Sequence, residues 1–241
     1  MSGDFETLEM NQPKISYSKE RSENNTKWLN EIINNKLKEV NQLRETLDIS
    51  GMNINSSKKN HFYKKLFNNQ NNKINSIIAE IKRRSPSKGM LAENLNVSKT
   101  VSEYESGGAA CISVLTEKDY FNGSNEDLLE AKNSINLPLL RKDFMLDPIQ
   151  IYESKMLGAD CVLLIVSALS KSTYKQLFEL ASQLGLDILT EVHDLNELDF
   201  ALSQNSKLIG INNRNLKSFD VDINTSIDLA RTINDNDIVL V

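Results

Sequence analysis

Acidic and basic side chains recur two residues apart within the apolar segments of this chain. Glu80 and Lys82 interrupt one such segment, and Glu191 and His193 close another. Because alternate residues of a strand point to the same side, the members of each pair would share one face. Charges on an otherwise apolar face are costly unless they are paired or used for chemistry. The two segments are therefore the first candidates for a catalytic site.

Two further segments repeat this spacing. Lys142 precedes Phe144, and Asn212 precedes Arg214. A lysine at the end of a strand commonly extends to solvent, and this interpretation remains open for the cluster Arg83, Arg84 and Lys88. Lys82 and Lys142 lie among Ile, Leu and Phe residues, which favours a role inside a site.

The strongest candidate for a general base is Glu191, which stands between Thr190 and Val192 without a charged partner close in the sequence. His193 is interpreted as structural. Burial near a second cation lowers the pKa of a lysine toward neutrality, where it can exchange protons. The same lysines would attract a carboxylate or a phosphate ester. No P-loop, dinucleotide fingerprint or metal-ligand cluster is present, so we expect proton-transfer chemistry on a small anionic molecule without a cofactor or metal.

The segments that carry these residues alternate between two patterns from residue 77 onward. The near-continuous apolar runs predict parallel strands covered by helices, at 77–82, 109–116, 138–144, 160–166, 187–193, 208–213 and 238–241. The amphipathic runs between them predict helices at 97–106, 125–133, 148–157, 171–184, 194–202 and 223–233. Either a doubly wound sheet or a barrel has this alternation. Polar groups at the carboxyl ends of four strands favour an α/β protein of the (β/α)8 TIM barrel type.

The residues before the first strand have a different character. Residues 1–24 show no periodicity and are predicted to be a loose tail. Residues 25–76 are predicted to be a helical extension, with one long helix at 26–46 and a short one at 61–67. The long helix carries an apolar stripe that must dock on the barrel, and a coiled coil is the alternative. Residues 77–241 then form the barrel.

The overall composition limits the possible partners. The chain has 241 residues, a formal net charge of -5 and two cysteines within apolar runs. A mildly acidic chain is a poor candidate for binding nucleic acid or an anionic membrane. No secretory signal or spanning segment is evident. We expect a cytoplasmic protein in which Cys111 and Cys161 are buried and reduced.

Long motifs in the second part of the chain resemble the indole-3-glycerol-phosphate synthase family. The resemblance lies in IIAEIKRRSPSKG, YESGGAACISVLTEKDYFNGSNEDL, LPLLRKDFMLDPIQIYESKMLGADCVLLI, LTEVHD and LIGINNRNLKSFDVD. It implies a carboxy-lyase of tryptophan biosynthesis. The implied reaction converts 1-(2-carboxyphenylamino)-1-deoxyribulose 5-phosphate to indole-3-glycerol phosphate, with loss of CO2 and water. Association with other enzymes of the pathway is left open.

The resemblance also implies roles for individual residues. Lys142 would be the general acid in ring closure and Glu191 the base in dehydration. Lys82 would bind the substrate carboxylate and support proton transfer, while Glu80 and Asn212 would orient the substrate and the catalytic groups.

Four further residues would contact the substrate or support its binding. Phe121 and Phe144 would pack against the anthranilate ring. Ser85 would lie near the phosphate or carboxylate, and Arg214 would support the site from behind.

The chain departs from the family at its carboxyl end, because 238–241 has the pattern of a seventh strand. The family continues with an eighth strand and a phosphate-binding loop. We therefore expect an incomplete barrel from a longer enzyme, with an inactive barrel fragment as the alternative. A phosphoribosylanthranilate isomerase is a weaker alternative, because it would not explain the long first helix or EIKRRSPSKG.

Overall fold

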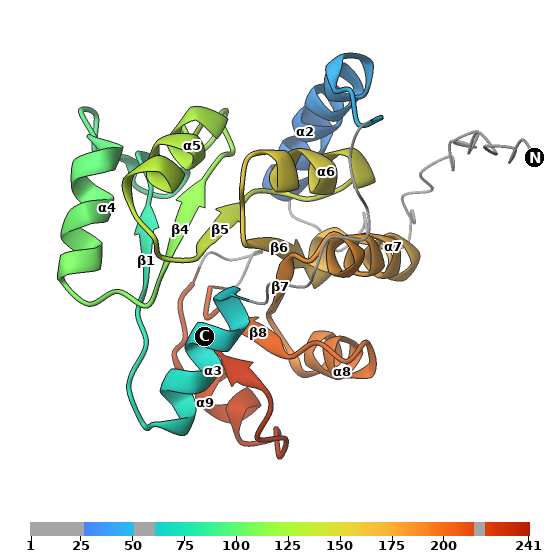
Figure 1. Ribbon diagram of the computed structural model, residues 1–241. Helices are drawn as coiled ribbons and strands as arrows, with labels where there is room; N and C mark the ends of the chain where they lie inside the picture. Colours follow the sequence, from blue (N-terminus) through green and yellow to red (C-terminus); the bar gives the residue numbers. More distant parts are fainter. Residues whose placement is uncertain (1–26, 51–60, 215–219) are drawn as a thin grey trace, which may run out of the picture.

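A single curled sheet of seven parallel strands organises the molecule. The computed structural model describes residues 27–50, 61–214 and 220–241 (Figure 1). The strand order is β1-β4-β5-β6-β7-β8-β9, and every neighbouring pair is parallel. The strands are β1 (Ile78–Ile81), β4 (Cys111–Leu115), β5 (Leu139–Lys142), β6 (Cys161–Ile165), β7 (Asp187–Val192), β8 (Leu208–Ile211) and β9 (Val239–Leu240).

Helices connect the strands and cover the outer side of the sheet (Figure 1). They are α4 (Val97–Ser106), α5 (Asn125–Ser134), α6 (Pro148–Met156), α7 (Lys171–Gln183), α8 (Leu195–Ser203) and α9 (Asn224–Ala230), with a 3-10 turn at Val166–Ala168. This alternation confirms the predicted TIM-like α/β fold. Within the described residues β1 and β9 each pair with one strand only, so the barrel is incomplete, as predicted.

Two helices precede the sheet, and both pack onto it. The buried stripe of α2 (Lys27–Thr46) includes Leu29, Ile32 and Val40, and α2 lies beside α6 in Figure 1. Because α2 packs against α6 of the same chain, the coiled-coil alternative does not apply. The second helix, α3 (His61–Asn71), is four residues longer at its end than the predicted 61–67. The predicted tail, 1–24, lies outside the described residues.

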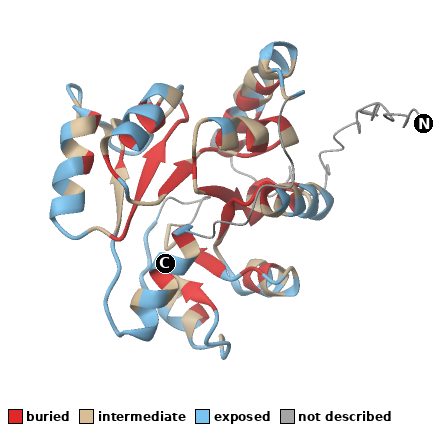
Figure 2. Ribbon diagram, viewed as in Figure 1, coloured by how far each residue is buried: buried red, intermediate tan, exposed pale blue. Residues whose placement is uncertain are grey.

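The helix α3 covers the amino-terminal end of the sheet. Phe62 and Leu66 are fully buried in the core. In Figure 2 the strands of the sheet are mostly buried, whereas the helices around them are exposed on their outer sides. The Asp187 carboxylate, at the start of β7, accepts the backbone N–H groups of Phe62 and Tyr63 at 2.9 and 3.0 Å. A carboxylate at a helix start stabilises the unpaired N–H groups there. This end of the barrel is thus closed by apolar packing and a cap, which leaves the opposite end for chemistry.

Several predicted boundaries need correction. The strand predicted at 138–144 ends at Lys142, because the Asp143 carboxylate accepts the N–H of Phe144 and turns the chain away from the sheet. The segment after β1 was predicted only as a loop, yet β2 (Arg84–Ser85) and β3 (Gly89–Met90) form a short antiparallel hairpin. The hairpin turn places Gly89 at a φ of 67°, a conformation that favours glycine.

The helix start at Asp147-Pro148 is confirmed. Asp147 accepts the N–H of Ile149 and forms a capping box with Gln150. The Ser124 hydroxyl caps α5 by accepting the N–H of Asp127, and the Asp127 carboxylate pairs with Arg83. Cys111 and Cys161 are buried free thiols, as expected. Among the described residues, no helix combines the length and apolar character needed to cross a membrane.

Candidate active site

A cavity of about 410 Å³ opens at the carboxyl ends of the strands. Its volume is within the range usual for small-molecule sites. Eight of the nine predicted site residues line it: Lys82, Ser85, Phe121, Lys142, Phe144, Glu191, Asn212 and Arg214. The ninth, Glu80, contacts two of the lining lysines. The structure therefore brings together all nine residues, which come from five separate segments of the chain.

Glu80 joins the two lysines of the site. One carboxylate oxygen forms an ion pair with Lys82, just after the end of β1, and the other accepts a hydrogen bond from Lys142 Nζ of β5 at 2.9 Å. All three side chains are partly exposed to the cavity. A carboxylate shared by two ammonium groups holds both at fixed positions and leaves each with donors free for a ligand.

The charged groups of this cluster shift one another's pKa values. Burial favours the neutral form of Glu80, but Lys142 and Lys82 outweigh it and lower the pKa of its carboxyl. Burial likewise acts to lower the pKa of Lys142, yet the Glu80 and Glu191 carboxylates raise it overall. The sequence-based expectation of a lowered lysine pKa is therefore wrong for Lys142. Its nearest partner is an anion and not a second cation, so the amine stays protonated.

Glu191 lies across the cavity on β7 and has two partners. Asn212 Nδ2, just after β8, donates to Glu191 Oε1 at 3.0 Å. His193 Nε2 lies 3.3 Å from the same oxygen, at ion-pair distance but without hydrogen-bond geometry. Burial raises the pKa of Glu191, but His193, Lys142 and Asn212 together lower it. The expectation that Glu191 lacks a partner close in sequence is thus wrong, since His193 is only two residues away.

His193 is itself fixed by the start of α8. The Glu197 carboxylate accepts its backbone N–H at 3.0 Å and contacts its Nδ1 at 3.0 Å. The imidazole is therefore placed between two carboxylates. Burial would lower the pKa of His193, but Glu191 and Glu197 raise it to about 9. A protonated His193 keeps a positive charge beside Glu191 at neutral pH.

Two aromatic side chains form part of the cavity wall. Phe121 follows β4 and Phe144 follows β5, and both line the cavity. Glu117 holds the first loop by accepting the N–H groups of Tyr120 and Phe121 at 2.8 and 3.0 Å. The two rings are therefore carried by loops with internal hydrogen bonds, a suitable arrangement for packing against a planar ring.

Polar and cationic groups occupy the other side of the opening. Ser85, in the hairpin, accepts the N–H of Lys88 at 3.3 Å, and both residues line the cavity. Arg214 lies beside Asn212, which accepts its backbone N–H at 3.0 Å. Of the cations whose role was left open, Lys88 belongs to the cavity, whereas Arg83 pairs with Asp127 outside it.

Sequence reasoning missed several residues of the cavity lining, among them Leu29, Glu117 and Asp143. Leu29 belongs to the apolar stripe of α2, so its burial was predicted but not its position at the cavity. Glu117 and Asp143 each follow the end of a strand, which was the available signal.

Glu39, Glu117 and Asp119 form the group of carboxylates that could in principle hold a cation, with ligand atoms within 4.8 Å of one another. Glu117 already accepts backbone N–H groups, and Lys36 and Lys118 lie beside Glu39 at 2.8 and 3.7 Å. Neighbouring lysines and N–H groups thus balance these charges without a metal.

A comparison with known protein families identifies the family of this chain. A model of the family described as "Indole-3-glycerol phosphate synthase" matches residues 29–241. The chain belongs to this family. Membership supports a lyase of tryptophan biosynthesis with a small phosphorylated substrate. The match includes α2 as well as the barrel strands, so the first helix is part of what defines the family.

Several solved structures are similar to this family member at low sequence identity. A 3-keto-L-gulonate-6-phosphate decarboxylase from Vibrio cholerae O1 biovar El Tor is 16% identical with a TM-score of 0.50, covering 68% of this chain and 76% of that one. An N-acetylmannosamine-6-phosphate 2-epimerase from Clostridium perfringens is 13% identical, with a TM-score of 0.47 and coverage of 62% and 71%. A mandelate oxidase is 10% identical with a TM-score of 0.38, covering 46% of this chain and 44% of that one.

Proposed function

We propose that this chain catalyses the synthesis of indole-3-glycerol phosphate from 1-(2-carboxyphenylamino)-1-deoxyribulose 5-phosphate. The reaction closes the indole ring by forming a carbon–carbon bond, then releases CO2 and water. It needs a proton donor, a base and a site for an anionic substrate. The observation that carries the proposal is one cavity in which a protonated Lys142 and an ionised Glu191 face a common space.

Lys142 is the proposed general acid. Its amine is held protonated by Glu80, and it lies at the end of β5 with access to the cavity. During ring closure the substrate carbonyl oxygen gains negative charge, and an ammonium group can transfer a proton to it. Glu80 stabilises the cation beforehand and fixes its position, so the donor needs little reorganisation.

Glu191 is the proposed base for dehydration. The loss of water requires removal of a proton, and a carboxylate that is ionised at neutral pH can accept it. Asn212 donates to one Glu191 oxygen, which fixes the carboxylate while the other oxygen remains available. The low pKa of Glu191 limits its strength as a base, so its position near the reacting carbon has to compensate.

Binding of the substrate follows from the cavity lining. Lys82 is partly exposed beside Glu80 and is the proposed contact for the substrate carboxylate. Phe121 and Phe144 provide apolar walls for the anthranilate ring. Ser85 is the proposed polar contact near the phosphate or carboxylate, and Arg214 is proposed to support the site from behind. A site with several cations attracts such an anion before any specific contact forms.

The test is steady-state turnover of the carboxyphenylamino substrate by the purified protein. We expect Lys142→Met and Glu191→Gln each to lower kcat by about 10²–10⁴-fold, the usual contribution of a positioned acid or base. Lys82→Met should mainly raise KM, because it removes a contact made before the chemical step.

Lys175→Met and Glu179→Gln are the matched controls, because both side chains are exposed on α7. Near-normal kcat in Lys142→Met would exclude it as the acid. Absence of any turnover by the unaltered chain would contradict the proposal and favour an inactive barrel fragment.

A further inference from the structure

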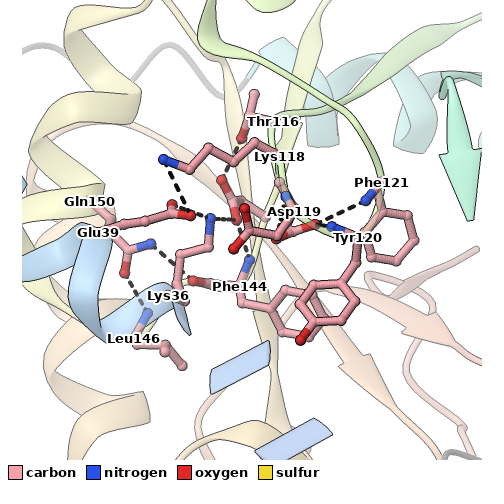
Figure 3. A network of polar contacts seen from close by, with 12 residues as sticks. Lys36, Glu39, Thr116, Lys118, Asp119, Tyr120, Phe121, Phe144, Leu146 and Gln150 are labelled. Carbon is pink, nitrogen blue, oxygen red and sulfur yellow. Dashed lines mark hydrogen bonds and ion pairs between the residues drawn. The ribbon is translucent and has the colours of Figure 1, made fainter. Parts of the chain in front are cut away.

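A buried lysine of α2 reaches the strand end that carries Lys142. The Lys36 side chain is only 3% exposed, and its Nζ lies 2.9 Å from Asp143 Oδ1 and 2.8 Å from Glu39 Oε2 (Figure 3). Burial would lower the pKa of Lys36, but Asp143 and Glu39 raise it, so the cation persists in the interior. A buried ion pair is formed at considerable desolvation cost, and its place beside the site suggests a specific role.

Asp143 is the point at which this cation acts on the site, because it lies between Lys142 and Phe144 in the chain. Its Oδ1 accepts the N–H of Phe144 at 2.8 Å, and its Oδ2 accepts the Thr116 hydroxyl at 2.6 Å. Thr116 N in turn donates to the backbone oxygen of Lys142 at 3.1 Å. The carboxylate thus helps to fix the backbone that directly follows the proposed acid.

The same helix also contacts the loop that carries the other aromatic wall. Asn35 Nδ2 donates to the Tyr120 hydroxyl at 3.4 Å, and Tyr120 precedes Phe121 in the chain. Farther along α2, Arg44 forms an ion pair with Asp147 at the start of α6, away from the cavity lining. The helix α2 therefore has two polar anchors. Lys36 pairs with Asp143 beside the site. Arg44 pairs with Asp147 away from the site and only attaches the helix to α6.

We propose that Lys36 is a positioning residue that, through Asp143, sets the placement of Lys142 and Phe144 in the cavity. The inference rests on the proposed function of Lys142. Without the Lys36 cation, the nearest remaining positive group to Asp143 is Arg141, whose Nη2 lies 3.6 Å from Oδ2. The carboxylate would turn toward Arg141 and weaken its hold on the Phe144 N–H. Small displacements of an acid lower the rate sharply without abolishing substrate binding.

The first test compares the kinetics of Lys36→Met, Lys36→Arg, Arg44→Met and Lys38→Met. We expect Lys36→Met to lower kcat by about 100-fold with a smaller change in KM, and Lys36→Arg to recover part of that loss. Arg44→Met loosens the helix elsewhere, and Lys38 is exposed, so both should keep kcat within about threefold of normal. Equal loss in Lys36→Met and Arg44→Met would overturn the inference, because it would indicate general loosening of α2.

The second test does not depend on turnover. Acetic anhydride acetylates unprotonated amines, and mass spectrometry reports the rate at Lys142 itself. If Lys36 positions Lys142 against Glu80, Lys36→Met should raise the Lys142 labelling rate several-fold, while Lys38→Met should not. Unchanged labelling in folded Lys36→Met would overturn the inference. If Lys36→Met does not fold, Lys36→Arg, which keeps the charge but shifts its position, should give a smaller rise in the same direction. If the unaltered chain lacks turnover, only the proposed function fails, and labelling still decides the role of Lys36.

Discussion

His193 should make the stability of the folded chain depend on pH in a predictable way. Its imidazole is 12% exposed and lies between Glu197 and Glu191 at 3.0 and 3.3 Å. Burial opposes the charged form, but the two carboxylates raise the pKa of His193 from 6.5 to about 9. A rise of this size corresponds to about 3 kcal/mol of free energy of unfolding.

The sign follows from the direction of the shift. The folded state holds the His193 proton more tightly than the unfolded state, so the full stabilisation is present below pH 6.5. It decreases as the pH rises and is lost as the pH passes through about 9. The pKa of Glu191 is lowered, so this carboxylate stays ionised across the range and does not reverse the trend.

Chemical denaturation of the unaltered protein and of His193→Gln, at a series of pH values, measures this contribution. The difference in free energy of unfolding between the two should shrink by about 3 kcal/mol between about pH 6 and about pH 9.5. His61→Gln, which replaces an exposed imidazole at the start of α3, is the matched control for the substitution itself. Parallel pH curves for the unaltered protein and His193→Gln would refute the reasoning.

Two substitutions test the packing that positions the site. An alanine Cβ at Gly123 would lie 2.2 Å from the backbone oxygen of Leu115, so Gly123→Ala should destabilise the fold by about 1–3 kcal/mol or more, as measured by urea denaturation. At Gly107 the nearest atom to an added Cβ would be 3.2 Å away, so Gly107→Ala should lower the free energy of unfolding by clearly less. Equal losses of stability in the two variants would contradict the reasoning. Phe62 is fully buried in α3, so Phe62→Ala should cost about 3–5 kcal/mol. The half-buried Phe67→Ala is its control, and a larger loss there would argue against α3 as the closure of the barrel.

The location of the site could be predicted because two periodicities agree. The apolar runs predicted parallel strands, and parallel strands place their carboxyl ends at one side of the sheet. The two-residue spacing then placed Lys82, Lys142 and Glu191 on the inner face, where the cavity lies. The hairpin at Arg84–Ser85 was not predicted, because its two-residue strands are too short to show any alternation.

The partners of these charges were harder to predict, because they come from other parts of the chain. Spacing suggested that Glu80 pairs with Lys82, and it does, but its contact with Lys142 depends on how β1 and β5 approach across the curled sheet. That contact reverses the direction expected for the pKa of Lys142. His193 was the opposite case, since the spacing rule placed it on the face of Glu191 and only its chemical effect was overlooked.

Lys36 shows why the N-terminal helix has to be included in an account of the site. An apolar stripe predicts that α2 docks, but it does not predict which polar side chain enters the interface with it. Lysine is rarely buried unless it is paired, so its pairing with Asp143 fixes both the register of the helix and the end of β5. The same contact that docks the helix therefore also determines where Lys142 and Phe144 stand.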